Sequence, residues 1–570
     1  MTTLFLILRV ELVVITVSMP QFNFFDSYLK ENITIDTQTL DEEYKYRIYA
    51  CGPTVYSYQH IGNMFAAFIP TTIYDLLKLA GVNVELAINI TDVGHLTGDN
   101  DGNADIGEDR MQKSAIAENK TPQAIAQFYL NHYKESLKLL NIELPKSPFN
   151  PLASSFITEQ LILALTLLSE DKAYMLDDGI YFDSEKNSEA LKFVDDLAGM
   201  PETNGDNNFQ KREILNTTKN PSDFAIWKFV TPDTIQKWRI DDYTSAGHTQ
   251  FNDQVLLLLL DLQYILDGYQ YTKLQTTWGC PGWHSECVAM IAKVLGRKFL
   301  KKRNQFNFSD FNGKTLIDLH LGGIEHLPLH HRNEILQSEG LGFHLSKNWI
   351  HWQHVLIDGK KMSKSLKNVF LITGNSEETG IKSLEEMNIK PLSYRMLMLE
   401  HSYQNSLDFT FDKMTQANTR LQNLRKQVAA LKGFVSKNRI YQCKNQNPET
   451  QNNYLNQIIS KGLNNWNYPA LLEEYQNQVT NCYNSLSLDE ISSFDHFDLN
   501  LFNILMKIDT EFLKLDLFKE PTEEVITLAK QRQKAKENKD YKLSDQLRLE
   551  ASELGYQIDD YKWGFSIWSS

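Results

Sequence analysis

The stretch from residue 46 to about residue 93 constrains the fold of this chain more than any other. A strand-like run, YRIYACG, is followed by a helical run, NMFAAFIPTTIYDLLKLAG, and then by the β-rich VNVELAINITDVG. Gly81 stands where a helix C-cap is expected. Strand, helix and strand in this order form a βαβ unit, which requires a parallel sheet. The sequence therefore predicts a Rossmann-like α/β domain with ligands at the carboxyl ends of its strands.

The second half of the chain has a different periodicity. From residue 411 to about 515 the apolar residues recur with helical spacing, and a Lys-rich helical segment over 528–555 ends at Gly555. With 570 residues the chain is too long for one compact domain. We therefore expect α-helical C-terminal domains after the α/β domain.

Charge and cysteine content limit the class of protein. The formal net charge of −15 argues against general coating of nucleic acid, although it leaves room for a local basic patch. The five cysteines are odd in number and widely scattered. That pattern is typical of a reducing compartment, and we expect a cytoplasmic protein.

Two apolar stretches raise the question of a membrane. TLFLILRVELVVITVSM, near the N-terminus, contains Arg9 and Glu11 and falls short of the roughly 20 apolar residues that a span needs. Translation from Met19, which would leave residues 1–18 out of the protein, a buried strand and an interfacial segment stay open for it. QVLLLLLDLQYILDGYQ, residues 254–270, contains Asp261 and is predicted to be a buried helix rather than a membrane span.

Two separated motifs carry groups that bind phosphate. HIGN, residues 60–63, opens the helix after the first strand, where backbone N–H groups favour an anion. DGKKMSKSLKN, residues 358–368, is a lysine-dense loop with interleaved serines, which suits a polyphosphate. Two such elements that close on one triphosphate predict a nucleotidyl-transfer site.

The pairing of HIGN with KMSKS resembles the signature of the class I aminoacyl-tRNA synthetases. The first motif of that family usually ends in a second histidine, so Asn63 is a departure that retains a donor. CGPTVY at 51–56, TWGCPGWHSECVAM at 277–290 and IDLHLGGIEHLPLHHRNEILQSEG at 317–340 are similar to segments of the cysteinyl-tRNA synthetase family. The similarity runs with gaps from about residue 44 to 568.

The resemblance implies one zinc ion per subunit, which binds the thiol of the substrate cysteine. The matching ligands are Cys51, Cys287, His330 and Glu334. His330 and Glu334 are spaced i, i+4 and so share one helix face, and thiolate, imidazole and carboxylate are zinc ligands. A hydrophobic pocket separates serine from cysteine by only about 1–3 kcal/mol, whereas a zinc–thiolate bond rejects a neutral hydroxyl strongly.

Taken one at a time, some of the four predicted zinc ligands also fit roles that involve no metal. Cys287 can be a packed helix cysteine, and His330 can be a buried core imidazole. Three further histidines lie close to the predicted ligands and could support or replace them, namely His284, His326 and His331. Cys280 is interpreted as a bystander. Trp283 is predicted to wall the amino-acid pocket, with a core position as the alternative.

The resemblance also implies residues for ATP and for tRNA. The predicted catalytic residues are His60, Asn63, Lys361 and Lys364. The predicted ATP-binding residues are His60, Gly62, Asn63, Gly322, Gly323, Glu325 and Lys364, with His354 nearby. The C-terminal segment resembles a small anticodon-binding domain, whose matching positions are Lys536, Tyr541, Asp545 and Asp560. A solvated amphipathic helix is the alternative interpretation of that segment.

The implied activity joins cysteine and ATP into cysteinyl-adenylate and then transfers cysteine to the 3′ end of tRNA-Cys, with Mg²⁺ carried by ATP. The implied partners are tRNA-Cys, ATP and L-cysteine, with no membrane and a monomeric state. Two alternatives are a cysteine:amino-sugar ligase on the same fold and a non-catalytic synthetase-like tRNA-binding module. The first lacks the C-terminal regions that residues 416–568 resemble, and the second is disfavoured by the retained HIGN and KMSKS residues.

The expected domain limits follow from these motifs. They are an N-terminal extension over 1–43, a catalytic domain over 44–345 with a connective insertion at about 115–215 and an unusual insert at about 231–276, a KMSKS-bearing stem-contact region over 346–415, a helical bundle over 416–519 and a small anticodon-binding domain over 520–570.

Overall fold

The structure is a computed structural model. It describes residues 21–36, 44–93, 110–198, 218–241, 252–302, 305–362, 368–437, 447–486 and 498–570. The interpretations offered for residues 1–18 and for Lys364 lie outside these ranges.

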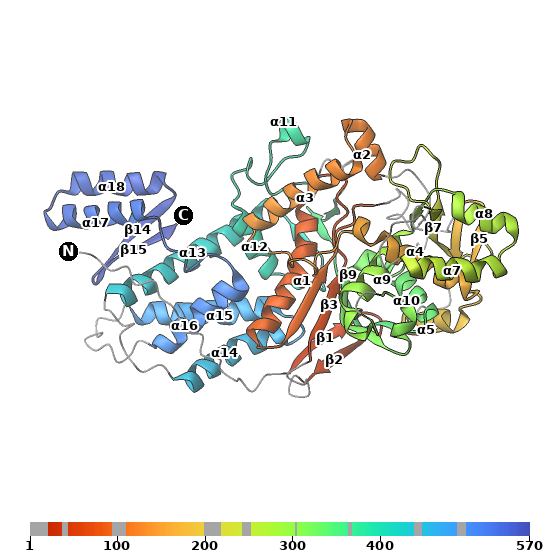
Figure 1. The fold of residues 1–570 in the computed structure, drawn as a ribbon. Helices are drawn as coiled ribbons and strands as arrows, with labels where there is room; N and C mark the ends of the chain where they lie inside the picture. Colours follow the sequence, from red (N-terminus) through yellow and green to blue (C-terminus); the bar gives the residue numbers. More distant parts are fainter. Residues whose placement is uncertain are drawn as a thin grey trace.

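A four-stranded parallel sheet forms the centre of the α/β part of the chain (Figure 1). Its strands, in the order β10-β9-β3-β4, are His344–Trp352, Thr315–Gly323, Tyr46–Ala50 and Val84–Ile88. Every residue of β3 is buried, as the middle of a parallel sheet covered on both faces requires. The predicted Rossmann-like sheet is confirmed.

Helix α1, Ile61–Leu79, connects β3 to β4 and completes the predicted βαβ unit. It ends just before Gly81, whose φ of +83° lies in the left-handed region that favours glycine at this position. Helix α10, His330–Gly340, connects β9 to β10 in the same way. Both helices begin at the carboxyl end of a strand, where the predicted ligand residues also lie.

A second, antiparallel sheet is inserted between β4 and β9 and lies at the right of Figure 1. Its strands, in the order β5-β6-β7-β8, are Ala173–Leu176, Gly179–Phe182, Phe224–Phe229 and Gly279–Pro281. The helices of this part of the chain are α2 Arg110–Glu118, α3 Pro122–Leu139, α4 Ile157–Ser169, α5 Ser188–Ala198, α7 Asn252–Ile265, α8 Gly268–Thr276 and α9 Trp283–Val294.

The prediction of a buried helix over 254–270 holds for only one face of the segment. The segment forms α7 and the start of α8, and only one face of α7 is buried. Leu256, Leu257 and Leu260 are exposed because α4 covers only the opposite side. Among the described residues, no helix combines the length and hydropathy that a membrane crossing requires.

An N-terminal hairpin packs between the two halves of the chain. Strands β1, Phe22–Asp26, and β2, Glu31–Ile35, pair antiparallel. The Asp26 carboxylate accepts a hydrogen bond from the backbone N–H of Trp349 in β10, and Asn23 accepts one from Asn465 in the helical region. A boundary at residue 43 therefore separates segments that are in direct contact.

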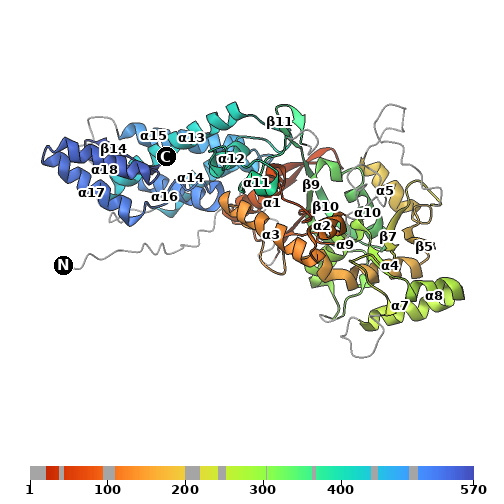
Figure 2. The ribbon, with the colours of Figure 1, turned by 90° about the horizontal axis from the view of Figure 1, so that it is seen from above.

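The helical C-terminal region extends to the left in Figures 1 and 2. It follows a three-stranded sheet in the order β12-β11-β13, formed by Lys360–Lys361, Val355–Ile357 and Leu407–Phe409. Helix α12, Pro391–Leu399, lies between β12 and β13 in the chain. After β13 the chain forms α13 Phe411–Lys437, α14 Pro448–Leu463, α15 Tyr468–Ser485 and α16 Leu499–Ile508. Arg395 of α12 is buried and donates to the carbonyl groups of Leu140 and Phe512, which ties the α/β part to the bundle.

The C-terminus is a small α/β unit rather than one long helix. The Lys-rich segment divides into α17, Glu523–Glu537, and α18, Tyr541–Glu553, because the chain turns at Lys539 with a φ of +60°. An antiparallel hairpin follows, formed by β14, Tyr556–Tyr561, and β15, Gly564–Ser569.

Candidate active site and metal centre

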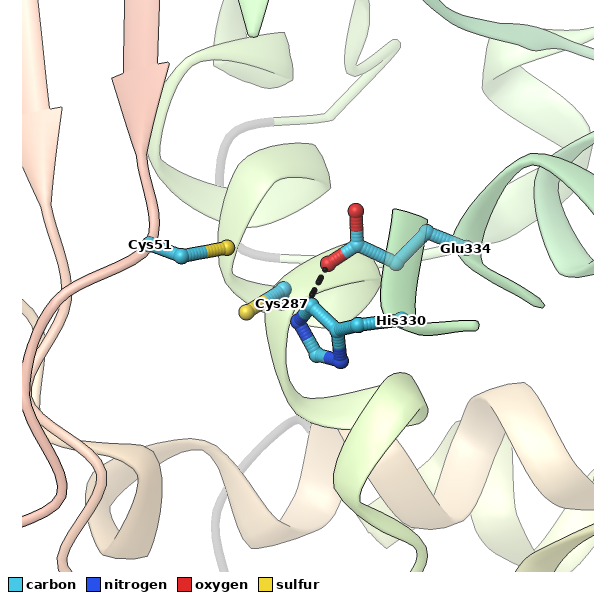
Figure 3. Close-up of side chains that lie close together, drawn as sticks. All are labelled: Cys51, Cys287, His330 and Glu334. Atoms are coloured by element: carbon cyan, nitrogen blue, oxygen red, sulfur yellow. Dashed lines mark ion pairs between the residues drawn. The ribbon is translucent and has the colours of Figure 1, made fainter. Parts of the chain in front are cut away.

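Four residues from three elements converge at the carboxyl end of β3. Cys51 follows β3 directly, Cys287 lies on α9, and His330 and Glu334 occupy the first two turns of α10. Their ligand atoms all lie within 4.8 Å of one another, and all four side chains are buried. Figure 3 shows the two sulfur atoms, the imidazole and the carboxylate pointing toward a common centre. The structure thus brings together the four residues that the sequence predicts as metal ligands.

The charges of these four groups are strongly coupled. Nε2 of His330 lies 3.0 Å from Oε1 of Glu334. Burial alone would lower the His330 pKa, but the adjacent carboxylate and the Cys287 sulfur outweigh it and raise the pKa to about 10. Burial would raise the Glu334 pKa, yet His330 and His320 hold it well below its usual range. The imidazole and the carboxylate therefore form a buried ion pair.

The two thiols hold their protons in this environment. Burial raises the pKa of Cys51, and the hydrogen bond with Cys51 together with burial raises the pKa of Cys287. A divalent cation at the centre of the four groups would replace these protons, because metal ligands bind in the deprotonated form. Two sulfur atoms, one nitrogen and one oxygen form a donor set that fits Zn²⁺.

A ring of histidines surrounds the four groups. Nε2 of His320 lies 3.0 Å from the second oxygen of Glu334, and Nδ1 of His284 lies 3.0 Å from Nδ1 of His330. Nε2 of His331 lies 3.4 Å from the Cys51 sulfur. Cys51, His320 and His331 also form a second set of closely spaced donor atoms. The imidazoles thus hold the thiol and the carboxylate in fixed orientations.

Two buried histidines near the site, His320 and His351, are absent from the sequence prediction. His284, His326 and His331 were recognised from their proximity to predicted ligands, whereas His320 and His351 were not. His320 lies on β9 directly opposite Tyr49 of β3, and His351 on β10 lies 2.8 Å from Nδ1 of His331. The spacing of His320 two residues before Gly322 places both on one side of β9, and this alternation is the signal that could have found it.

Trp283 begins α9 beside Cys51, Cys287, His330 and Glu334, the four residues that are called the metal-ligand set from here on. Its ring stacks on the imidazole of His330 with 4.2 Å between ring centroids and 27° between planes. An indole in this position limits how His330 can turn. It also supplies an apolar wall next to the ligand atoms, where the sequence predicts the amino-acid pocket.

The HIGN element and the lysine loop lie side by side. A Cβ atom placed on Gly62 would lie 2.5 Å from the terminal methyl of Met362 and 3.0 Å from the His60 ring. A larger residue at position 62 would require Met362 to move away from the HIGN element. The two motifs that the sequence predicts to close on one triphosphate are therefore adjacent in the structure.

The side chain of Asn63, which is predicted to donate to the phosphate of ATP, also makes a hydrogen bond within the protein. Its side-chain oxygen accepts a hydrogen bond of 3.0 Å from the backbone N–H of His60, at the start of α1. This bond orients the amide and satisfies one of the N–H groups that precede a helix. Lys361 is exposed at the end of β12, and Lys364 lies outside the described residues.

The glycine turn at the end of β9 allows close packing. A Cβ on Gly322 would lie 2.5 Å from the His331 ring, and one on Gly323 would lie 2.4 Å from a Glu325 oxygen. The Glu325 carboxylate is 3.6 Å from Nδ1 of His354, so the two side chains that were predicted to face the nucleotide lie together.

The predicted anticodon residues fall into two pairs. Lys536 of α17 lies 2.9 Å from Asp560 of β14, and Arg532 donates two hydrogen bonds of 2.7 Å to the same carboxylate. These bonds, above all those from Arg532, lower the Asp560 pKa to about 2. Tyr541 and Asp545 are exposed one turn apart on α18. The structure brings Lys536 and Asp560 together and leaves the second pair on the surface.

Comparisons with solved structures define the class of the fold. A methionyl-tRNA synthetase of Mycobacterium tuberculosis bound by methionyl-adenylate matches with a TM-score of 0.51 and 11% identity, over 84% of this chain and 93% of that one. A leucyl-tRNA synthetase (LeuRS) from Agrobacterium radiobacter in a ternary complex matches with a TM-score of 0.50 and 12% identity, over 84% and 85%. The parallel sheet with its HIGN element is the fold of a class I aminoacyl-tRNA synthetase.

The family follows from sequence comparison. The profile of the class I (C) tRNA synthetase catalytic domain matches residues 37–241 and 270–419, and the chain belongs to this family. The cysteine–tRNA ligase of Zymomonas mobilis is 33% identical over 73% of this chain and 66% of its own length. That of Bacteroides fragilis is 30% identical over 91% and 93%.

Proposed function

We propose that this chain is a cysteine–tRNA ligase, which activates L-cysteine with ATP and transfers it to the 3′ end of tRNA-Cys. The observation that carries the proposal is the buried set of Cys51, Cys287, His330 and Glu334 at the carboxyl end of β3. The named relatives that match over most of the chain support it. The alternative of a non-catalytic module is not favoured by any observation on this site.

The first step needs no nucleophile from the protein, because the cysteine carboxylate attacks the α-phosphate of ATP and pyrophosphate leaves. His60 and the N–H groups at the start of α1 would donate to the phosphate oxygens, with Gly62 and Asn63 shaping the turn. Lys361 and Lys364 would neutralise the charge that develops on the leaving group, together with Mg²⁺ carried by ATP. Gly322, Gly323 and Glu325 would hold the adenosine.

Amino-acid selection rests on the four-residue set, which would hold one zinc ion per chain. A bound zinc ion supplies a Lewis acid that prefers a thiolate to a hydroxyl. The protein's own part is to fix the donor atoms. His320 orients Glu334, His331 contacts Cys51, and Trp283 limits the pocket on the side of His330. Serine would then be rejected because its hydroxyl does not replace the sulfur.

Recognition of tRNA would use the C-terminal unit. Lys536, Tyr541, Asp545 and Asp560 lie on α17, α18 and β14, and Tyr541 offers an exposed ring on which an unpaired base can stack. The described helices α13 to α18 extend beyond the catalytic region, as charging of a long tRNA requires and ligation to an amino-sugar does not. We further propose a monomer in a reducing, cytoplasmic compartment, in keeping with the free cysteines of the described residues.

Cysteine-dependent exchange of pyrophosphate into ATP tests the proposal directly. The full zinc-loaded chain is expected to catalyse exchange with cysteine and not with serine, and to charge tRNA-Cys. Absence of exchange with cysteine would overturn the enzyme assignment. Exchange without charging of tRNA-Cys would overturn the assignment of tRNA as acceptor.

A further inference from the structure

Helix α7 has two apolar faces, and only one of them is covered. Val255, Leu259 and Leu262 are buried on the side of α4. On the other side Leu257, Leu260 and Tyr264 follow at i, i+3 and i+7 and are 57%, 55% and 89% exposed. Leu256 and Ile265 in α7 and Tyr269 in α8 extend the same surface. An ordinary surface helix has one apolar stripe, so the second stripe indicates a binding surface.

The reaction of the synthetase does not account for this surface. The family profile matches the chain on both sides of residues 242–269 and leaves that segment, which includes α7, unmatched. Figures 1 and 2 place α7 and α8 at the outer edge of the molecule, at the end opposite α17 and α18. The exposed leucines therefore lie neither in the HIGN element and the lysine loop nor in the C-terminal unit.

A groove with acidic groups runs along the same helix. It has a volume of about 520 Å³, and its lining includes Glu170, Asp261, Tyr264, Ile265 and Asn307. The groove thus shares two residues with the apolar surface. Asp253 and Asp261 are exposed, and neither is part of an ion pair among the described residues. Glu170 is paired with Lys172 at 2.6 Å, so the negative charge without a nearby counter-charge is that of Asp253 and Asp261. The surface therefore combines exposed leucine side chains with these two carboxylates.

Exposed leucines beside negative charge favour some binding partners of this surface over others. In a second copy of the chain, antiparallel pairing of two α7 helices would bring two Asp261 carboxylates together, which opposes self-association. An anionic lipid surface would be repelled by the same carboxylates. A helix that has an apolar face flanked by lysine or arginine matches both the leucines and the groove.

We propose that α7 and its groove form a docking site for a basic amphipathic helix of a partner protein. The apolar side chains of that helix would cover Leu257, Leu260 and Tyr264. A lysine or arginine at its edge would enter the groove beside Asp261. The site lies apart from the metal-ligand set, so docking would attach the synthetase to a partner without occupying its substrate sites.

Titration of the full chain with designed peptides tests the proposal. The probe is a labelled 18-residue helical peptide with leucine on one face and lysine on the other, and its counterpart has glutamate in place of lysine. The leucine–lysine peptide is expected to bind at least about tenfold more tightly than its counterpart, and more weakly as salt is added. Leu260→Asn and Asp261→Asn are each expected to weaken its binding. Ile116→Asn, which changes an exposed isoleucine of α2, is the matched control and is expected to leave binding unchanged.

Three results would overturn the proposal. Equal binding by the wild type and by either α7 variant would show that the peptide does not use this surface. Self-association that Leu260→Asn abolishes would assign the surface to a second copy of the chain. Binding to phosphatidylcholine vesicles that Leu260→Asn abolishes would assign it to lipid. Aminoacylation measured in parallel keeps this test separate from that of the proposed function, because neither residue lies in the catalytic region.

Discussion

The metal-ligand set and the C-terminal unit present their polar side chains in opposite ways. Around Cys51 and Glu334 every donor is buried, and its neighbours fix it before any substrate arrives. In the C-terminal unit Lys536 and Asp560 pair with each other at the surface, and Tyr541 is 63% exposed. A small substrate that differs from its competitor by one atom needs a rigid, dry site. A flexible RNA can be read by side chains that exchange one partner for another.

The largest effect is expected when one buried sulfur of the metal-ligand set is replaced by oxygen. Cys287→Ser is expected to lower zinc affinity and cysteine-dependent exchange by more than about 100-fold, because loss of an outer partner alone costs about 10- to 100-fold. Zinc content and pyrophosphate exchange measure the effect. Cys280→Ser, on the nearby strand β8, is the control and is expected to keep both. Undiminished zinc in Cys287→Ser would contradict the ligand assignment.

Zinc binding is expected to depend steeply on pH. Burial raises the pKa of Cys51, the hydrogen bond with Cys51 together with burial raises that of Cys287, and Glu334 raises that of His330 to about 10. Near neutral pH these groups carry protons that the metal must displace, so affinity falls as pH falls, by about tenfold per pH unit for each proton displaced. Competition with a chelator between pH 8 and pH 6 gives the slope. A flat profile would mean that thiols and imidazole are not the ligands.

Loss of a residue that contacts a predicted zinc ligand is expected to lower zinc affinity less than loss of the ligand itself. His320→Ala removes the imidazole that lies 3.0 Å from Glu334, and zinc affinity is expected to drop by about 10- to 100-fold. His344→Ala, at an exposed histidine paired with Glu339, serves as the control. If both variants bind zinc as the wild type does, His320 does not position Glu334.

The smallest effect is expected at the ion pair between the buried Arg532 and the partly exposed Asp560. Arg532 lowers the Asp560 pKa to about 2, below the ordinary value of about 3.9, so this interaction stabilises the C-terminal unit above pH 4 and is lost as pH falls toward 2. Because Asp560 is one-third exposed, Asp560→Asn is expected to cost about 1 kcal/mol at pH 7. Hydrogen exchange of residues 523–570 in urea measures the loss.

The control for this variant is Asp545→Asn, at an exposed carboxylate of α18. Asp545→Asn is expected to leave the stability of the unit unchanged. The difference between the wild type and Asp560→Asn should shrink below pH 4. A difference that stays constant down to pH 2 would show that the Asp560 charge is not what stabilises the unit.

The sequence predicts the site better than it predicts surfaces. The βαβ unit and the i, i+4 spacing of His330 and Glu334 reflect local geometry, so the sheet and this pair could be foreseen from the residues themselves. That Cys51 and Cys287 join the pair was implied only by the resemblance to the family, because contacts so far apart in the chain leave no local signal. His320 and His351 could not be foreseen, because their positions depend on the register between β9 and neighbouring strands, which is long-range information. The exposure of Leu257 and Leu260 was missed for a related reason. An apolar run does not reveal whether one or both faces of its helix are covered.

The central claim is that the four buried groups select cysteine through sulfur. Zinc-edge X-ray absorption of the zinc-loaded chain tests it most directly. The account predicts two sulfur ligands at about 2.3 Å in the free protein, a third when cysteine is added, and no change with serine. A sulfur count that cysteine does not change, or that Cys287→Ser does not lower, would contradict the account.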